Sequence, residues 1–166
     1  MNGAAIGALI CTIFGGVWAI AGGTGLPKRS RIAAITFATV FTLLLVAFVF
    51  VRPEPAVRAG VFQGRVYGLS VAGEVLAIVI AVALLRWRRR RDLILPAVGL
   101  IVGLHFIGMW KAVGSPLFLA VAAAMSAVSL VAFLLPGWDR NGFSARQSVA
   151  GFGCAAILWI AALAIR

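Results

Sequence analysis

The sequence predicts an all-α membrane protein, folded as one bundle of six transmembrane helices. Apolar residues make up 63% of the chain and charged residues only 11%, far from the balance of a soluble domain. The apolar residues gather in stretches of about 18 or more, the length that a helix needs to cross the roughly 30 Å hydrocarbon core. The alternating polarity that a membrane β-barrel would need is absent. These observations exclude a soluble fold and favour a helical bundle.

The 166 residues form one domain by length. Six apolar stretches, separated by turns and loops rich in glycine, proline and arginine, are expected to span the bilayer. They cover residues 4–22, 32–51, 67–85, 93–110, 116–135 and 148–165. The five tryptophans mostly lie near the ends of these stretches, where indole rings prefer the membrane interface.

The basic residues of the connections predict the orientation. The first, third and fifth connections carry ten of them: Lys28, Arg29, Arg31, Arg86, Arg88, Arg89, Arg90, Arg91, Arg140 and Arg146. The opposite side carries five: Arg52, Arg58, Arg65, Lys111 and Arg166. Because basic loops preferentially stay in the cytoplasm, we expect the arginine-rich third connection inside and both chain termini outside.

The net charge of +11 would suggest a nucleic-acid partner in a soluble protein. Here the basic residues flank apolar stretches, where they can contact anionic lipid head groups. Once the loops are assigned, no basic surface is left for nucleic acid. The predicted partners are therefore the lipid bilayer and, at the cluster from Arg86 to Arg91, its anionic head groups.

Pairs of small residues four positions apart predict where helices approach closely. These pairs are Gly3 and Gly7, Gly99 and Gly103, Ala120 and Ala124, and Gly151 and Ala155. Lipid gives apolar helices no hydrophobic reason to associate, so close contact through small residues contributes to packing. Contacts within one bundle are the favoured interpretation, and a face for a homo-oligomer is the alternative.

Two ionisable residues lie well within predicted spans, Glu74 in the third and His105 in the fourth. At 1.5 Å per residue, both lie roughly 8–10 Å below the outer ends of their spans. The midpoint of the two positions falls between Arg89 and Arg90, in the turn that joins the spans. The sequence therefore places the acid and the imidazole at matching depth on adjacent antiparallel helices.

Tyr67 and Ser70 share one helical face with Glu74, at spacings of three and seven. Together with His105 they are expected to line a polar pocket that opens to the outer side. A bare carboxylate in lipid is costly, so Glu74 must be protonated, paired or hydrated. Apolar surroundings favour its neutral form and a nearby imidazolium favours the carboxylate, which would make the site responsive to protons. A structural hydrogen bond between two helices is the alternative.

Familiar enzyme signatures are missing from the sequence, including the zinc-protease, nucleophile-elbow and phosphate-loop motifs. With one histidine and four acids, a metal centre with several protein ligands would be hard to build. Cys11 and Cys154 have no metal or redox spacing and are expected to be small buried residues. We therefore expect neither an enzyme nor a cofactor or metal site.

The segment Val102–Ile107, Val-Gly-Leu-His-Phe-Ile, resembles the signature of a family of small multi-pass bacterial membrane proteins. That family carries a Gly-x-His-Phe segment followed by proline in a late helix, and sometimes an acid in the preceding span. Gly108 stands here where the proline would be. The resemblance covers residues 67–116 and implies a bacterial plasma membrane protein, but no activity is established for the family.

Two functions therefore stay open. In the first, the chain is a small transporter or permeation protein in which Glu74 and His105 couple protonation to opening or binding. In the second, it is a non-transporting membrane scaffold or subunit in which the same pair only holds two helices together.

Overall fold

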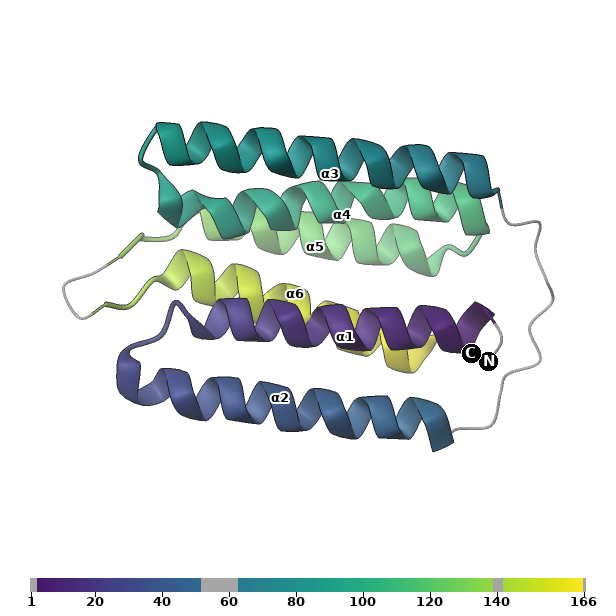
Figure 1. The fold of residues 1–166 in the computed structure, drawn as a ribbon, viewed down its shortest axis with the longest axis horizontal. Helices are drawn as coiled ribbons and strands as arrows, with labels where there is room; N and C mark the ends of the chain where they lie inside the picture. Colours follow the sequence, from purple (N-terminus) through teal and green to yellow (C-terminus); the bar gives the residue numbers. More distant parts are fainter. Residues whose placement is uncertain (1–2, 52–62, 139–141, 166) are drawn as a thin grey trace.

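The computed structural model describes residues 3–51, 63–138 and 142–165, and over these residues the chain forms six α-helices (Figure 1). They are α1 (Gly3–Gly23), α2 (Lys28–Val51), α3 (Gly64–Trp87), α4 (Ile94–Val113), α5 (Leu117–Leu134) and α6 (Ala145–Ala164), with a short 3₁₀-helix, η1 (Arg91–Leu93), before α4. Each of the six is long and apolar enough to cross a membrane. The predicted fold class is confirmed, and the predicted spans end within about four residues of the helices.

Local chemistry sets several helix ends. Gly114 terminates α4 in the left-handed region with φ of 79°, which a glycine adopts without a side-chain clash. Ser144 caps α6, because its Oγ accepts a hydrogen bond from the N–H of Gln147 at 3.4 Å. The chain turns sharply between α3 and α4 at Arg89, whose φ of 55° is uncommon for a residue with a side chain.

The helices pack in the spatial order α2, α1, α6, α5, α4 and α3, with α6 also in contact with α4. Figure 1 shows α2 and α3 at opposite edges of this array and both termini at one end. The α6 helix is central, and eight of its residues are buried. None of the residues of α3 is buried, so α3 is an edge helix held mainly by α4.

Two glycines let the backbones of α1 and α6 come close together. A Cβ placed on Gly151 would lie 2.2 Å from Gly22 Cα and 2.3 Å from Gly22 N. On α4, Gly99 and Gly103 likewise face Ser129 and Ser126 of α5. Packing through small residues within the bundle is thus confirmed for these two helix pairs.

The same prediction is wrong for Ala120, which is exposed, whereas neighbouring Val121 and Ala122 are buried. The spacing of two alanines on α5 did not show which face of the helix meets its partners. In lipid both faces of such a helix are apolar, so composition does not distinguish the packed face from the lipid face.

Two tryptophans point into the bundle, which corrects their predicted place at the interface. Trp18 is 5% exposed and belongs to the main core with Cys11, Cys154 and Met125. Trp159 lies against Gly15, and its indole N–H donates to the carbonyl of Thr12 at 3.3 Å. Both lie near helix ends along the chain, but the rotation of α1 and α6 turns them inward.

Both cysteines are buried and free, as their expected role as small core residues requires. The contacts Gly22–Gly151 and Gly15–Trp159 fix an antiparallel register of α1 and α6. In that register Cys154 lies opposite Ala19, about eight residues along α1 from Cys11. At 1.5 Å per residue the two thiols are separated by about 12 Å along the bundle.

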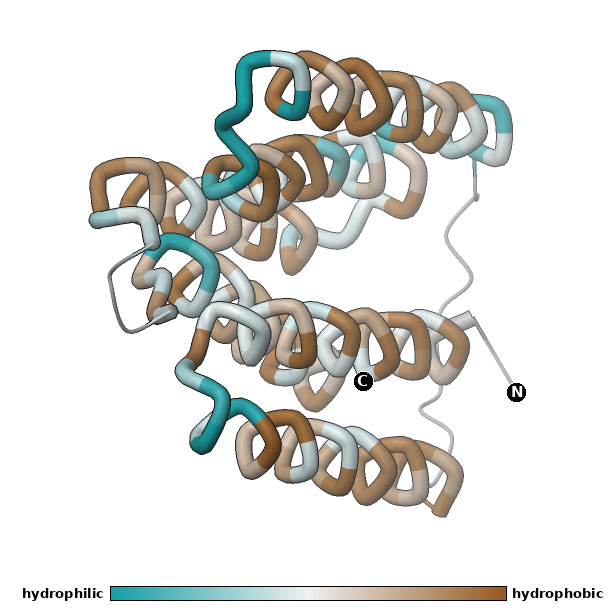
Figure 2. The backbone as a smooth tube through the Cα atoms, turned by 60° about the vertical axis from the view of Figure 1, so that its left-hand side comes forward, coloured by the Kyte–Doolittle hydropathy of each residue, from teal (hydrophilic) through white to brown (hydrophobic). Residues whose placement is uncertain are grey.

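The polar residues gather at the ends of the helices and the hydrophobic residues along their length (Figure 2). The first, third and fifth connections lie at the same end of the bundle (Figure 1), so their described basic residues share that end. They are Lys28, Arg29, Arg31, Arg86, Arg88, Arg89, Arg90, Arg91 and Arg146. Four other residues of the orientation count lie outside the described residues: Arg52, Arg58, Arg140 and Arg166.

Candidate functional site

The α3–α4 hairpin positions the candidate site. Glu74 is ten residues from the start of α3 and His105 eight from the end of α4, which places them about 15 and 12 Å from the helix ends. Because the helices are antiparallel and joined by a tight turn, both positions reach the same level. Toward the helix ends α3 carries Arg65 and Arg86, and α4 carries Lys111.

The structure brings Glu74 and His105 into contact, as their matching depths predicted. Glu74 Oε2 lies 3.3 Å from His105 Nδ1, and the two side chains are 18% and 10% exposed. Ser70 Oγ lies 3.0 Å from the same nitrogen and 3.5 Å from the carbonyl oxygen of His105. One ring nitrogen is therefore shared by a carboxyl group and a hydroxyl group.

Three of the four residues predicted to form the site come together. Tyr67 lies one turn before Ser70 on α3 and is not among the residues that line the hollow beside Glu74. Sequence spacing placed it on the same helical face, but the α3 residue that lies against Gly108 of α4 is Ser70. There, a Cβ on Gly108 would lie 2.0 Å from Ser70 Oγ and 2.7 Å from Ser70 Cβ. The missing side chain of Gly108 lets the serine approach His105.

The contact requires a proton between its two partners. A carboxylate oxygen and an unprotonated ring nitrogen both carry lone pairs, so at 3.3 Å either Nδ1 or the carboxyl group must hold a hydrogen. If Nδ1 holds it, the ring donates toward Glu74 and Ser70. Among the described residues nothing hydrogen-bonds to Nε2 of His105.

A hollow of about 230 Å³ lies beside the pair. It is lined by four residues of α3 and three of α4: Ser70, Gly73, Glu74, Ala77, Ile101, Leu104 and His105. Gly73 is exposed with nothing within 4 Å of a Cβ built on it, and Leu104 is 52% exposed. Both lie near the middle of their helices, so the hollow opens along the flank of the hairpin. The predicted opening toward the outer side stays a prediction.

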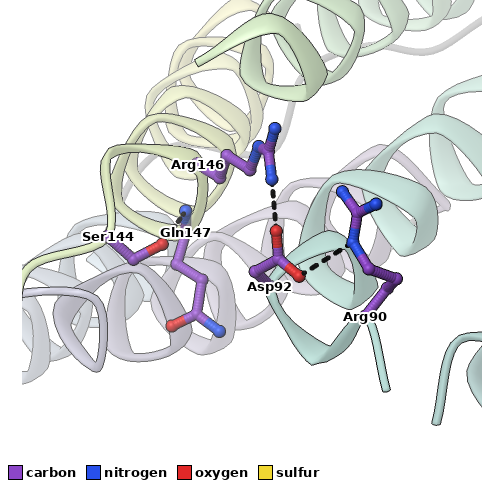
Figure 3. Close-up of polar contacts among 5 residues, drawn as sticks. All are labelled: Arg90, Asp92, Ser144, Arg146 and Gln147. Atoms are coloured by element: carbon purple, nitrogen blue, oxygen red, sulfur yellow. Dashed lines mark hydrogen bonds and ion pairs between the residues drawn. The ribbon is translucent and has the colours of Figure 1, made fainter. Parts of the chain in front are cut away.

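A second polar cluster, at the basic end, was not found from the sequence. Arg146 Nη1 donates to Asp92 Oδ2, and Arg90 Nε lies 3.6 Å from Asp92 Oδ1 (Figure 3). Asp92 and Arg146 have side chains 17% exposed, whereas Arg90 is 53% exposed. The pair joins η1 to the start of α6. A single acid in an arginine-rich turn was the signal in the sequence, but its partner lies 54 residues away.

The same end carries a link to the first connection. The backbone N–H of Ser144 donates to the carbonyl of Gly25 at 2.7 Å. Together with the Asp92–Arg146 pair, this bond ties the three connections of the basic end to one another. Such ties hold the helix ends in place, whereas the Glu74–His105 contact lies near the middle of the α3–α4 hairpin.

Fold and composition define the class of protein: the chain is a multi-pass membrane protein, a bundle of six apolar helices. Comparison with protein-family models, curated proteins and solved structures finds no match. The resemblance at residues 102–107 therefore stays a prediction. Among the described residues no group of three or more His, Cys, Asp and Glu side chains could hold a metal ion.

Proposed function

We propose that the chain is a small transporter or permeation protein of a bacterial plasma membrane and that Glu74 and His105 are its proton-responsive site. The observation that supports this is the contact of an acid and an imidazole, midway along two apolar helices, beside a hollow of about 230 Å³. Ionisable groups within spans are costly and are usually retained for transport, proton transfer or ligand binding.

The two protonation states of the site differ in charge. With a proton on both ring nitrogens, the imidazolium and the Glu74 carboxylate sum to zero. Loss of the proton from Nε2 leaves a neutral ring that still donates through Nδ1, and the site carries a charge of −1. The Glu74–His105 contact is kept in both states, so a proton enters or leaves without breaking the hairpin.

Proton flux through proteoliposomes tests this proposal. The purified chain is reconstituted with a pH-sensitive dye inside, and a pH gradient is imposed across the membrane. We expect the wild type to dissipate the gradient faster than empty vesicles, and Glu74→Gln and His105→Gln to abolish the difference. Thr39→Val is the matched control, because the Thr39 hydroxyl bonds only to its own helix, at Ile35 O, 2.9 Å away. Flux at the wild-type rate in both site variants would refute the proposal.

The second candidate is a scaffold or subunit in which the pair is structural. The observation that favours it is the edge position of α3, which has no buried residue and for which Glu74 and Ser70 supply polar contacts to α4. A double-mutant cycle on unfolding should give a coupling of about 1 kcal/mol for Glu74 and His105. Coupling without proton flux would favour the structural role.

We also propose that both termini lie outside and that the arginines of the third connection contact anionic head groups in the cytoplasmic leaflet. The ten-to-five asymmetry of basic residues supports this orientation. An introduced thiol at Ala56, which lies outside the described residues, should react with an impermeant reagent applied to intact cells, and one at Arg89 should not. Reaction at Arg89 would refute the orientation.

A further inference from the structure

The mouth of the Glu74 hollow is apolar and faces the lipid. Gly73 and Leu104 form its exposed rim, and Ala77 and Ile101 line its walls. Gly73 lies nine residues from the start of α3 and Leu104 nine from the end of α4, about 14 Å from either end. At that depth an exposed side of a membrane helix meets acyl chains, because the head groups lie further out.

The charges around the hollow select the sign of a ligand. When His105 is neutral, the Glu74 carboxylate gives the site a charge of −1. The other charged residues of α3 and α4, Arg65, Arg86 and Lys111, are basic and lie toward the helix ends, while α5, which packs behind α4, carries none. A positively charged ligand in water therefore meets basic residues first, whereas one dissolved in the bilayer reaches the carboxylate directly.

The size of the hollow limits what enters it. A volume of about 230 Å³ exceeds the roughly 150 Å³ that holds a benzene molecule and falls below the roughly 300 Å³ of typical drug-sized pockets. An ammonium group with a short apolar body fits within it, and the rest of a longer body can remain among the acyl chains beyond Gly73.

From these features, and resting on the proposed function, we propose that the Glu74–His105 site takes an organic ammonium ion dissolved in the bilayer, which enters sideways between α3 and α4. The ammonium head donates to the Glu74 carboxylate, and the apolar body lies along Ala77, Ile101 and Leu104. Binding is favoured once Nε2 of His105 has lost its proton, because the two positive charges would otherwise share one carboxylate. Proton and ammonium ion therefore compete for the site.

Carbodiimide labelling of the full chain in lipid nanodiscs tests this access route. Dicyclohexylcarbodiimide, which partitions into bilayers, reacts with protonated carboxyl groups, and the adduct on the Glu74 peptide is measured by mass spectrometry. Three competitors are compared at equal total concentration: hexylammonium, which is charged and membrane-soluble; methylammonium, which stays in water; and hexanol, which is membrane-soluble and neutral. Glu74→Gln gives the background.

We expect hexylammonium to slow labelling by at least ~tenfold and the other two to have little effect. Equal protection by methylammonium would overturn entry from the lipid, and equal protection by hexanol would overturn selection for a charge. Labelling of Glu74 that hexylammonium does not slow would overturn the site itself.

Two glycines of α3 provide a matched pair of variants for the route. Gly73 and Gly68 both have nothing within 4 Å of a built Cβ, but only Gly73 lines the hollow. Gly73→Leu should block labelling of Glu74, and Gly68→Leu should leave both labelling and its protection by hexylammonium unchanged. Equal behaviour of the two variants would overturn the lateral entrance. This assay measures access without transport, so a chain that binds hexylammonium but carries no proton flux would contradict the proposed function and leave the ligand assignment standing.

Discussion

Gly151→Ala is the substitution whose effect the structure defines most sharply. The added Cβ would lie 2.2 Å from Gly22 Cα and 2.8 Å from the carbonyl oxygen of Trp18. Both are backbone atoms of α1 and cannot rotate away. Because carbon atoms rest about 3.5–4.0 Å apart, α1 and α6 must separate by more than ~1 Å at their crossing. The core around Trp18 and Cys154 would be loosened as a result.

The expected loss of stability follows from two opposing contributions. Overpacking a tight contact costs about 1–3 kcal/mol. The cost here lies near the upper end of that range, because the clashing atoms belong to the backbone and cannot rotate away. Replacing a helical glycine by alanine returns up to about 1 kcal/mol. We therefore expect Gly151→Ala to be less stable than the wild type by about 1–2 kcal/mol. Trp18 lies at the contact, so the unfolding transition can be followed by its fluorescence in detergent micelles.

Two further glycines give a graded series for the same measurement. A Cβ on Gly22 would meet Phe152 N at 2.8 Å, a milder clash, whereas one on Gly73 would meet nothing within 4 Å. The expected order of stability is Gly73→Ala above Gly22→Ala above Gly151→Ala, with Gly73→Ala at or above the wild type. If the Gly151→Ala variant is as stable to unfolding as the Gly73→Ala variant, the close approach of α1 and α6 is refuted.

Three other outcomes are expected. Gly108→Ala should lower stability by about 1 kcal/mol or more, because its Cβ would lie 2.7 Å from Ser70 Cβ; a variant as stable as the wild type would show that α3 and α4 are further apart. Cys11 and Cys154 should both remain as thiols under mild oxidation, since about 12 Å along the bundle exceeds the ~7 Å Cα separation that a disulfide allows; thiol counting by mass spectrometry would reveal a bond and contradict the register. Asp92→Asn should cost roughly 1–3 kcal/mol in chemical unfolding, less than the ~3–5 kcal/mol of a fully buried pair, because its side chain is 17% exposed; no change would mean that the tie to α6 does not contribute.

Much of this molecule follows from the sequence alone. Hydrocarbon thickness fixes how long an apolar helix must be, so the six spans could be located to within a few residues. A tight turn fixes how far each residue of a hairpin lies from the end, so the matching depth of Glu74 and His105 could be predicted by counting. Neither inference needs to know how the helices are rotated or which of them are neighbours.

The rotation of each helix about its own axis, and the helices that it packs against, are decided only in the tertiary structure. Tyr67 shares a helical face with Glu74 but lies outside the hollow, Trp18 turns into the core, and Asp92 pairs with an arginine 54 residues away. In water, an apolar face must be the buried face, so sequence pattern indicates rotation. In lipid the buried and exposed faces are both apolar, and close contacts such as Gly22 with Gly151 decide which helices meet. The positions of these glycines can be read from the sequence, but which glycines come into contact is known only from the folded bundle.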